Sequence, residues 1–123
     1  MTTEKLSHRP VESIDFETIC QLPKNSEELF FMFPKAVYPL TVCQLKSAIE
    51  NRFASTVILL RTQYEVRVYK EQIVGFANFY EVKENEFCSI GNVIVKSNLR
   101  NKGIGTFLIK TMENIGIEKY NVS

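Results

Sequence analysis

A chain of 123 residues with 45% apolar and 24% charged side chains has the composition of one soluble globular domain with its own core. Its formal net charge of +1 gives no overall electrostatic case for binding nucleic acid or an anionic membrane, because both require a concentrated positive field, and only a local basic cluster stays open. The three cysteines are odd in number and lack a CxxC spacing, so we predict no disulfide framework, no metal site and a reducing, cytoplasmic location. The N-terminal stretch MTTEKLSHRP has no apolar segment, and we expect neither a signal peptide nor a membrane span.

The first half of the chain combines one strand pattern with three short helical patterns. The predicted elements are a strand at 5–11 and helices at 13–22, 26–33 and 41–52. Pro23 and Pro34 stop the first two helices, because proline cannot continue a helical hydrogen-bond ladder. Thr41 and Gln44 match a capping box that opens the third helix.

The apolar residues then change to a period of two, which is typical of strands. The predicted strands are 64–70, 73–80 and 87–95, joined by turns at 71–72 and 83–86. The segment 55–61 either forms a strand of its own or lengthens the strand that follows it. Gly91, inside the last of these strands, predicts a bulge or a close backbone approach.

A helical period returns after Gly103. One wide apolar face is formed by Ile104, Phe107, Leu108, Thr111, Met112 and Ile115. We predict that this helix packs on the sheet and ends at Gly116, and that 117–123 begins one more strand. The order of the elements predicts an α+β (mixed α/β) fold with a largely antiparallel sheet and flanking helices.

The stretch VKSNLRNKGIGT, residues 95–106, places two glycines and two basic residues between a predicted strand and a predicted helix. The first amides of a helix have no partner within the helix, and the helix dipole is positive there, so a phosphate fits this position. Glycines let the backbone approach the phosphate oxygens, and Arg100 and Lys102 add positive charge. The local chemistry predicts a cradle for a phosphate or pyrophosphate. The alternative is a glycine-rich turn that binds nothing.

Other phosphate-binding motifs fit this loop less well. A dinucleotide-binding GxGxxG pattern needs a third glycine at position 108, which is leucine. The GxxxxGK[ST] pattern of a P-loop is absent. The pattern that remains is R-x-x-G-x-G.

The stretch GNVIVKSNLRNKGIGTFLIKTM resembles motif A of the GNAT superfamily of N-acetyltransferases. IVGFANFYEV resembles the strand before motif A, and FPKAVYPLTVCQLKSAIENR resembles the helical segment that precedes the sheet in some members. The resemblance covers roughly residues 30–116 and implies a single GNAT-like acetyltransferase domain over 1–123. It implies an acetyl-CoA-dependent N-acetyltransferase that transfers an acetyl group from this co-substrate to an amine acceptor.

The resemblance also implies where the cofactor binds. The pyrophosphate of acetyl-CoA would lie on the backbone of Arg100, Asn101, Lys102, Gly103, Ile104, Gly105 and Thr106. The strand residues Val93, Ile94 and Val95 would pair through their backbone with the pantetheine arm. A backbone N–H of this strand would donate to the oxyanion that forms during transfer.

The sequence departs from the family pattern at its end. It stops at Ser123, before the usual C-terminal strand and helix, so we expect a domain truncated at its C-terminus whose second cleft wall comes from a partner chain or from residues outside this sequence. Tyr120 does not match the tyrosine that members often use as an acid. The alternative function is a truncated or degenerate domain that binds CoA weakly, or a dimeric interaction module without catalysis. A homodimer is expected in each case.

No catalytic residue is assigned from the sequence. The candidates for a base or a substrate contact are Glu81, Glu84, Glu86, His8 and Tyr38. We expect the three glutamates to lie in a solvated turn and His8 to be a surface residue. Tyr38 is the candidate for an acceptor contact. We expect the aromatic run Phe30, Phe31 and Phe33 to lie in the core.

Overall fold

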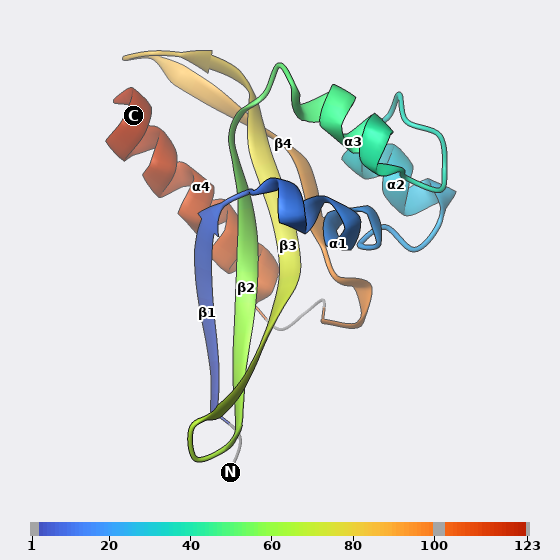
Figure 1. The fold of residues 1–123 in the computed structure, drawn as a ribbon. Helices are drawn as coiled ribbons and strands as arrows, with labels where there is room; N and C mark the ends of the chain where they lie inside the picture. The colour runs from blue at the N-terminus through green and yellow to red at the C-terminus, as the bar shows by residue number, and fades with distance from the viewer. Residues whose placement is uncertain (1–2, 100–102, 123) are drawn as a thin grey trace.

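One four-stranded antiparallel sheet organises the chain in the computed structural model, which describes residues 3–99 and 103–122 (Figure 1). The strands lie in the order β1-β2-β3-β4. Their bounds are Thr3–Pro10 for β1, Phe53–Glu65 for β2, Val68–Lys83 for β3 and Phe87–Val95 for β4. The helices are α1 (Phe16–Cys20), α2 (Ser26–Met32), α3 (Val42–Ile49) and α4 (Ile104–Tyr120), with short 3-10 turns η1 (Ser13–Asp15) and η2 (Ser97–Leu99). The predicted α+β class with an antiparallel sheet is confirmed.

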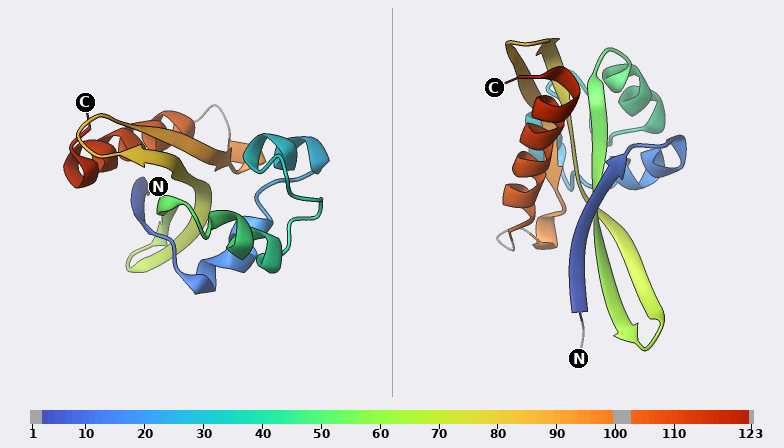
Figure 2. Two further views of the ribbon diagram at one scale, coloured as in Figure 1. Left: turned by 90° about the horizontal axis from the view of Figure 1, so that it is seen from above. Right: turned by 90° about the vertical axis from the view of Figure 1, so that its left-hand side faces the viewer.

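The helices cover the two faces of the sheet unequally. Helix α4 crosses one face alone, and α1, α2 and α3 lie on the other (Figure 2). Alternate side chains of β2 pack on opposite faces of the sheet. Val57 and Leu59 point toward the three short helices, whereas Ile58 and Leu60 point toward α4. The central strands are therefore buried on both sides, which explains the apolar run in β2.

The sharp turn between β2 and β3 is not where the sequence predicts it. It falls at Val66 and Arg67, with Arg67 at a φ of 62°, and the predicted strand at 64–70 is wrong because this turn divides it. Glu71 and Gln72, the predicted turn, lie inside β3 and pair with Arg61 and Leu60 of β2. A two-residue turn preserves the period of two on both sides, so the alternation alone cannot locate it. The segment 55–61 belongs to β2.

Helix α4 continues past Gly116 to Tyr120, so the predicted end of the helix and the predicted strand from 117 are wrong for the described residues. Asn121, with a φ of 53°, caps the helix instead. Gly116 is buried, and a Cβ added there would lie 2.8 Å from the Sγ of Cys88 and 3.1 Å from Cγ2 of Val122. This glycine therefore serves close packing of α4 against β4 and the chain end.

Side chains cap the N-termini of α2 and α3, and only the Thr41 half of the predicted capping box is formed. Asn25 accepts a hydrogen bond from the amide of Glu28 at 2.8 Å, and Thr41 accepts one from the amide of Gln44 at 3.2 Å. The side chain of Gln44 does not return to Thr41 as in a full capping box. It bonds to the backbone of Val37 and Pro39 and so holds the loop before α3.

The aromatic run at the end of α2 is only partly core. Phe33 is buried, as expected, but Phe30 is 58% and Phe31 74% exposed, which corrects the prediction for both. Helix α2 is short and turns Leu29 and Met32, three residues apart, toward the core. The two intervening phenylalanines therefore face solvent.

A bidentate ion pair fastens the end of β1 to the first helical turn. Both terminal nitrogens of Arg9 donate to the carboxylate of Asp15, at 2.6 and 2.8 Å, and the amide of Glu12 donates to the same carboxylate at 2.8 Å. Asp15 is nearly buried, and the hydrogen bond from Arg9 is the main reason why its pKa lies below the ordinary value.

Replacement of Asp15 should therefore destabilise the fold in a pH-dependent way. We expect Asp15→Asn to lower the free energy of unfolding at pH 7 by about 1–3 kcal/mol, because a charged acceptor of three hydrogen bonds is lost. Since the folded pKa is lowered, this contribution is present above the ordinary aspartate pKa near 3.9 and disappears as the pH falls through the lower folded value. Urea denaturation of both proteins at pH 7 and at pH 3 measures the loss in the free energy of unfolding and its dependence on pH.

The matched control is Glu12→Gln, which removes the second carboxylate near Arg9. The distance between the Arg9 and Glu12 side chains is longer, 3.6 Å, and the Glu12 side chain is 67% exposed. We therefore expect little change in the free energy of unfolding. An Asp15→Asn defect of equal size at both pH values would contradict the role given to the ion pair.

Candidate functional site

Strand β4 carries a bulge where the sequence predicts an irregularity. Three steps of β4, from Gly91 to Ile94, lie opposite two steps of β3, from Asn78 to Phe76. Asn92 sits in the bulge with a φ of 53°, a conformation that asparagine tolerates better than most residues. Its buried side chain donates from Nδ2 to the carbonyl of Met32 at 2.7 Å. The bulge is therefore tied to the last residue of α2.

Gly91 allows a close approach as well. A Cβ added to it would lie 2.6 Å from Cδ1 of Tyr80, whose ring covers this part of β4. Of the two predicted alternatives, the bulge is confirmed, and the group that approaches the glycine closely is a side-chain ring. The same approach places the Tyr80 ring next to the bulge.

The start of α4 presents exposed backbone. Gly103 is its N-cap with a φ of 80°, and the amide of Phe107 makes the first helical hydrogen bond, to the Gly103 carbonyl at 3.0 Å. A Cβ added to Gly103 would meet nothing within 4 Å. Arg100, Asn101 and Lys102, the first part of the predicted loop, lie outside the described residues.

The two stretches of the predicted cofactor site lie side by side. A Cβ added to Gly105 would have one neighbour within 4 Å, Cγ2 of Val95 at 4.0 Å, so the first turn of α4 lies against the end of β4. Ile94 and Ile104 are buried and hold these two elements in the core, whereas Val93 is 36% exposed. Within the described chain, β4 pairs with β3 only, so alternate backbone groups of β4 face away from the sheet.

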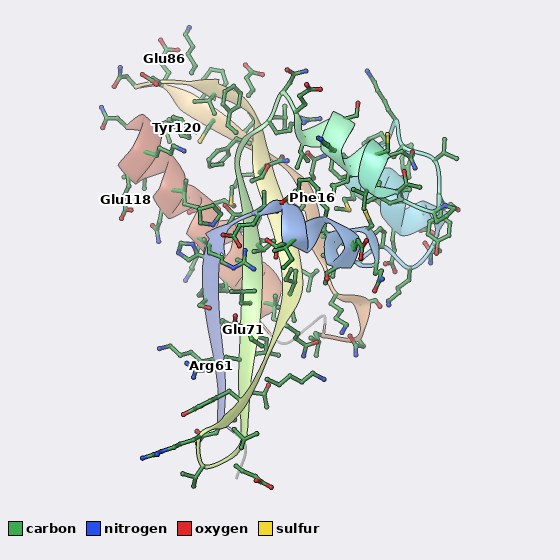
Figure 3. The ribbon with its side chains drawn as sticks, in the orientation of Figure 1. Phe16, Arg61, Glu71, Glu86, Glu118 and Tyr120 are labelled. Atoms are coloured by element: carbon green, nitrogen blue, oxygen red, sulfur yellow. The ribbon has the colours of Figure 1, made fainter. Side chains whose placement is uncertain are left out.

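The glutamate candidates lie at the other end of α4. Glu81, Glu84 and Glu86 are exposed, and Glu86 forms an ion pair with Lys83 at 3.0 Å. Glu84 and Glu86 lie in the solvated turn, as expected, but Glu81 lies inside β3 opposite Ser89 of β4, which corrects the prediction for this residue. The turn contacts the last residue of the helix, since the amide of Asn85 donates to the Tyr120 carbonyl at 3.0 Å (Figure 3). Seventeen residues of helix therefore separate them from Gly103, about 25 Å.

The remaining candidates have structural surroundings. His8 is exposed on β1, as expected. The hydroxyl of Tyr38 donates to the carbonyl of Lys24 at 2.9 Å and so fastens the loop before α3. Tyr120 packs its ring edge-to-face on Phe53 and Phe79, with centroids 6.5 and 6.0 Å away.

A pocket of about 680 Å³ that the sequence analysis did not find lies between the segment after α2 and one side of α3. Phe33, Ala36 and Ala48 supply apolar lining, and Lys35 and Arg52 supply positive charge. The pocket begins at Phe33, directly after the residue that Asn92 binds. The only sequence signal for it is the spacing of residues 43, 44, 47 and 48 on one side of α3.

Two of the three thiols, those of Cys20 and Cys88, are partly buried, whereas Cys43 is exposed on α3 in the lining of the pocket. Burial raises the pKa of the Cys20 and Cys88 thiols, so both stay protonated near neutral pH. In the described ranges, no cluster of three histidine, cysteine, aspartate or glutamate side chains could hold a metal ion. None of the described helices is both long and apolar enough to cross a membrane.

The sequence profile of the acetyltransferase (GNAT) family matches residues 24–122, which include the bulged strand and the glycine turn. The chain belongs to this family. A comparison with curated protein sequences gives no significant match. The family assignment supports acyl transfer as the general chemistry of this GNAT protein.

Solved structures share the fold of this GNAT chain. A domain from Methanocaldococcus jannaschii superposes with a TM-score of 0.62 at 24% identity, over 93% of this chain and 73% of that one. A candidate acetyltransferase from Pyrococcus horikoshii gives a TM-score of 0.55 at 17% identity, over 90% of this chain but only 34% of that one. These likenesses confirm the GNAT-like architecture.

The bond between Asn92 and Met32 should contribute measurably to stability. We expect Asn92→Ala to lower the free energy of unfolding by about 1–3 kcal/mol, because the Met32 carbonyl loses its buried partner. Asn85→Ala is the control: Asn85 also has a positive φ, 67°, and its side chain accepts one exposed hydrogen bond, from Asn121. Thermal and urea unfolding of both variants compare the two sites. Equal losses would show that the backbone conformation, and not the buried bond, carries the effect.

Proposed function

We propose that this chain is an acetyl-CoA-dependent N-acetyltransferase that acts on an amine acceptor, and that residues 1–123 work as one domain. The observation that carries the proposal is that the first turn of α4 lies beside the end of the bulged strand β4, where a Cβ added to Gly105 would come within 4.0 Å of Val95. This arrangement joins an anion-binding helix start to a strand with an outward-facing edge.

The glycines fit the proposed cofactor. At Gly103 a Cβ would project into open space, and at Gly105 it would touch only one methyl group, so a pyrophosphate could approach the backbone at both positions. The positive end of the helix dipole favours its charge. By family resemblance, Arg100, Asn101 and Lys102 would complete the loop, with Ile104 and Thr106 contributing backbone amides.

The acyl end of the cofactor is assigned to β4. The backbones of Val93, Ile94 and Val95 would orient the pantetheine arm along the strand edge, and an amide there would donate to the developing oxyanion. When bound, acetyl-CoA supplies the acetyl group: its C–S bond breaks as the C–N bond forms, and the proton lost by the amine ends on the thiol. No side chain of this chain is assigned as base or acid.

Mutation of the glycine turn tests the proposal. We expect Gly105→Glu to abolish acetyl-CoA binding, because a carboxylate would stand where the pyrophosphate approaches. The fold should persist, since a glutamate in the first turn of a helix is favoured by the dipole. Calorimetric titration with acetyl-CoA and then with desulfo-CoA measures binding, with intact mass confirming the chain.

The control is Asn114→Glu, which adds the same charge at an exposed position of α4, nine residues further on or about 14 Å along the helix. It should bind acetyl-CoA like the unaltered chain. Retained binding in Gly105→Glu, or no binding by the folded unaltered chain, would falsify the assignment of the loop.

The cytoplasmic location stays a prediction, and so does the homodimer. With β4 assigned to the cofactor, β1 is the other edge of the described sheet, and its backbone groups can pair with a second copy. Light scattering at tens of micromolar should give twice the chain mass of 14.2 kDa. A monomer mass would refute the dimer.

A further inference from the structure

We infer that the pocket between the segment after α2 and α3 binds an acceptor that carries a carboxylate next to an apolar group, with Arg52 as the residue that recognises the carboxylate. This inference rests on the proposed function, because it names the class of acceptor for the same reaction. It also makes a claim about binding that can be tested without acetyl-CoA.

The charge of the pocket is one-sided. Its lining contains Lys35 and Arg52 but neither aspartate nor glutamate, and the rest of the lining is largely apolar. The polar side chain of Gln44 is already engaged by the backbone of Val37 and Pro39, so it fixes the wall of the pocket. A cavity of about 680 Å³ with this lining suits an apolar group bearing one anionic end.

Arg52 is held in place while its terminal nitrogens stay available. Its Nε donates weakly to the carbonyl of Ala48 at 3.4 Å, and its guanidinium lies 5.8 Å from the centroid of the Tyr80 ring. Among the described residues, no carboxylate lies within ion-pair distance of it. A half-buried arginine fixed from two sides is suited to bidentate binding of a carboxylate.

Two contacts connect this pocket to the bulge of β4. The first runs from Arg52 to Tyr80, whose ring lies against Gly91, the residue before the bulge. The second runs from Phe33 in the pocket to its neighbour Met32, whose carbonyl accepts the hydrogen bond of Asn92. The carboxylate site therefore lies beside the strand to which the acetyl group is assigned.

Direct binding is measured first, with two probes that share a phenyl group on a three-carbon chain and end in an anionic carboxylate or in a neutral hydroxyl. The carboxylate 3-phenylpropionate and the neutral 3-phenylpropan-1-ol are titrated into the full chain at pH 7 and followed by NMR chemical shifts. We expect the carboxylate to bind at least about tenfold more tightly, because a charge-assisted bidentate contact distinguishes them. Arg52→Met should reduce its affinity to that of the alcohol, and Arg52→Lys should retain part of the preference.

Arg61→Met is the matched control. Arg61 also stacks on a tyrosine, 3.8 Å from the centroid of Tyr69, but it lies in the extended β2–β3 hairpin and not at α3 (Figure 3). Its loss should leave both affinities unchanged. Thermal unfolding of each variant confirms that the fold persists.

The second measurement compares acetyl transfer to phenylalanine and to 2-phenylethylamine. The unaltered chain should favour phenylalanine in kcat/KM by about tenfold or more, and Arg52→Met should remove the preference mainly through KM. Equal affinity for the two binding probes, or a carboxylate preference that survives in Arg52→Met, would overturn the inference. Carboxylate binding by a chain that fails to bind acetyl-CoA would overturn the proposed function and leave the carboxylate site standing.

Discussion

The hydrogen bond from Asn92 to the carbonyl of Met32 is the contact on which the geometry of the site depends. A strand at the edge of a sheet is held from one side only, and the bulge removes one step of its pairing with β3. The asparagine side chain replaces the lost contact with one to α2. Because the pocket begins at the next residue, Phe33, this bond fixes both β4 and the pocket wall.

The same region contains two buried polar atoms with no partner among the described residues, the side-chain oxygens of Asn78 and Asn92. Asn78 pairs with Gly91 in the sheet, one residue before Asn92, so the two lie in adjacent positions. Each unsatisfied oxygen costs about 1–3 kcal/mol unless a water donates to it. The hydrogen bond from Asn92 to Met32 opposes this cost and favours the observed register, because a slip of β4 by one residue would move Asn92 to the opposite face and break the bond to α2.

The elements that pack on the sheet could be predicted because burial on one face gives a sequence a regular period. The wrong predictions of helix and turn positions fall where the local pattern fits more than one structure. A glycine after a helical pattern is typical of a helix end, yet Gly116 lies inside the helix and makes room for Cys88, which is far away in the sequence. The turn at Val66 and Arg67 contains no glycine, proline or asparagine and does not interrupt the alternation. A local pattern cannot show either the distant neighbour or the turn.

The two halves of the proposed site differ in the same respect. Recognition by backbone groups needs glycines and an exposed strand edge, and these leave a local pattern at residues 91–106 that could be predicted. Recognition by side chains in the pocket depends on Arg52 meeting Tyr80 and on Asn92 meeting Met32, which is 60 residues away in the sequence, and only the fold brings these together.

This separation has a consequence for specificity. The residues assigned to the acetyl donor are different from the arginine assigned to the acceptor. Tyr80 and Met32 lie between the two groups. A change at Arg52 can therefore alter which acceptor binds while the glycine turn, and with it the proposed cofactor site, stays intact.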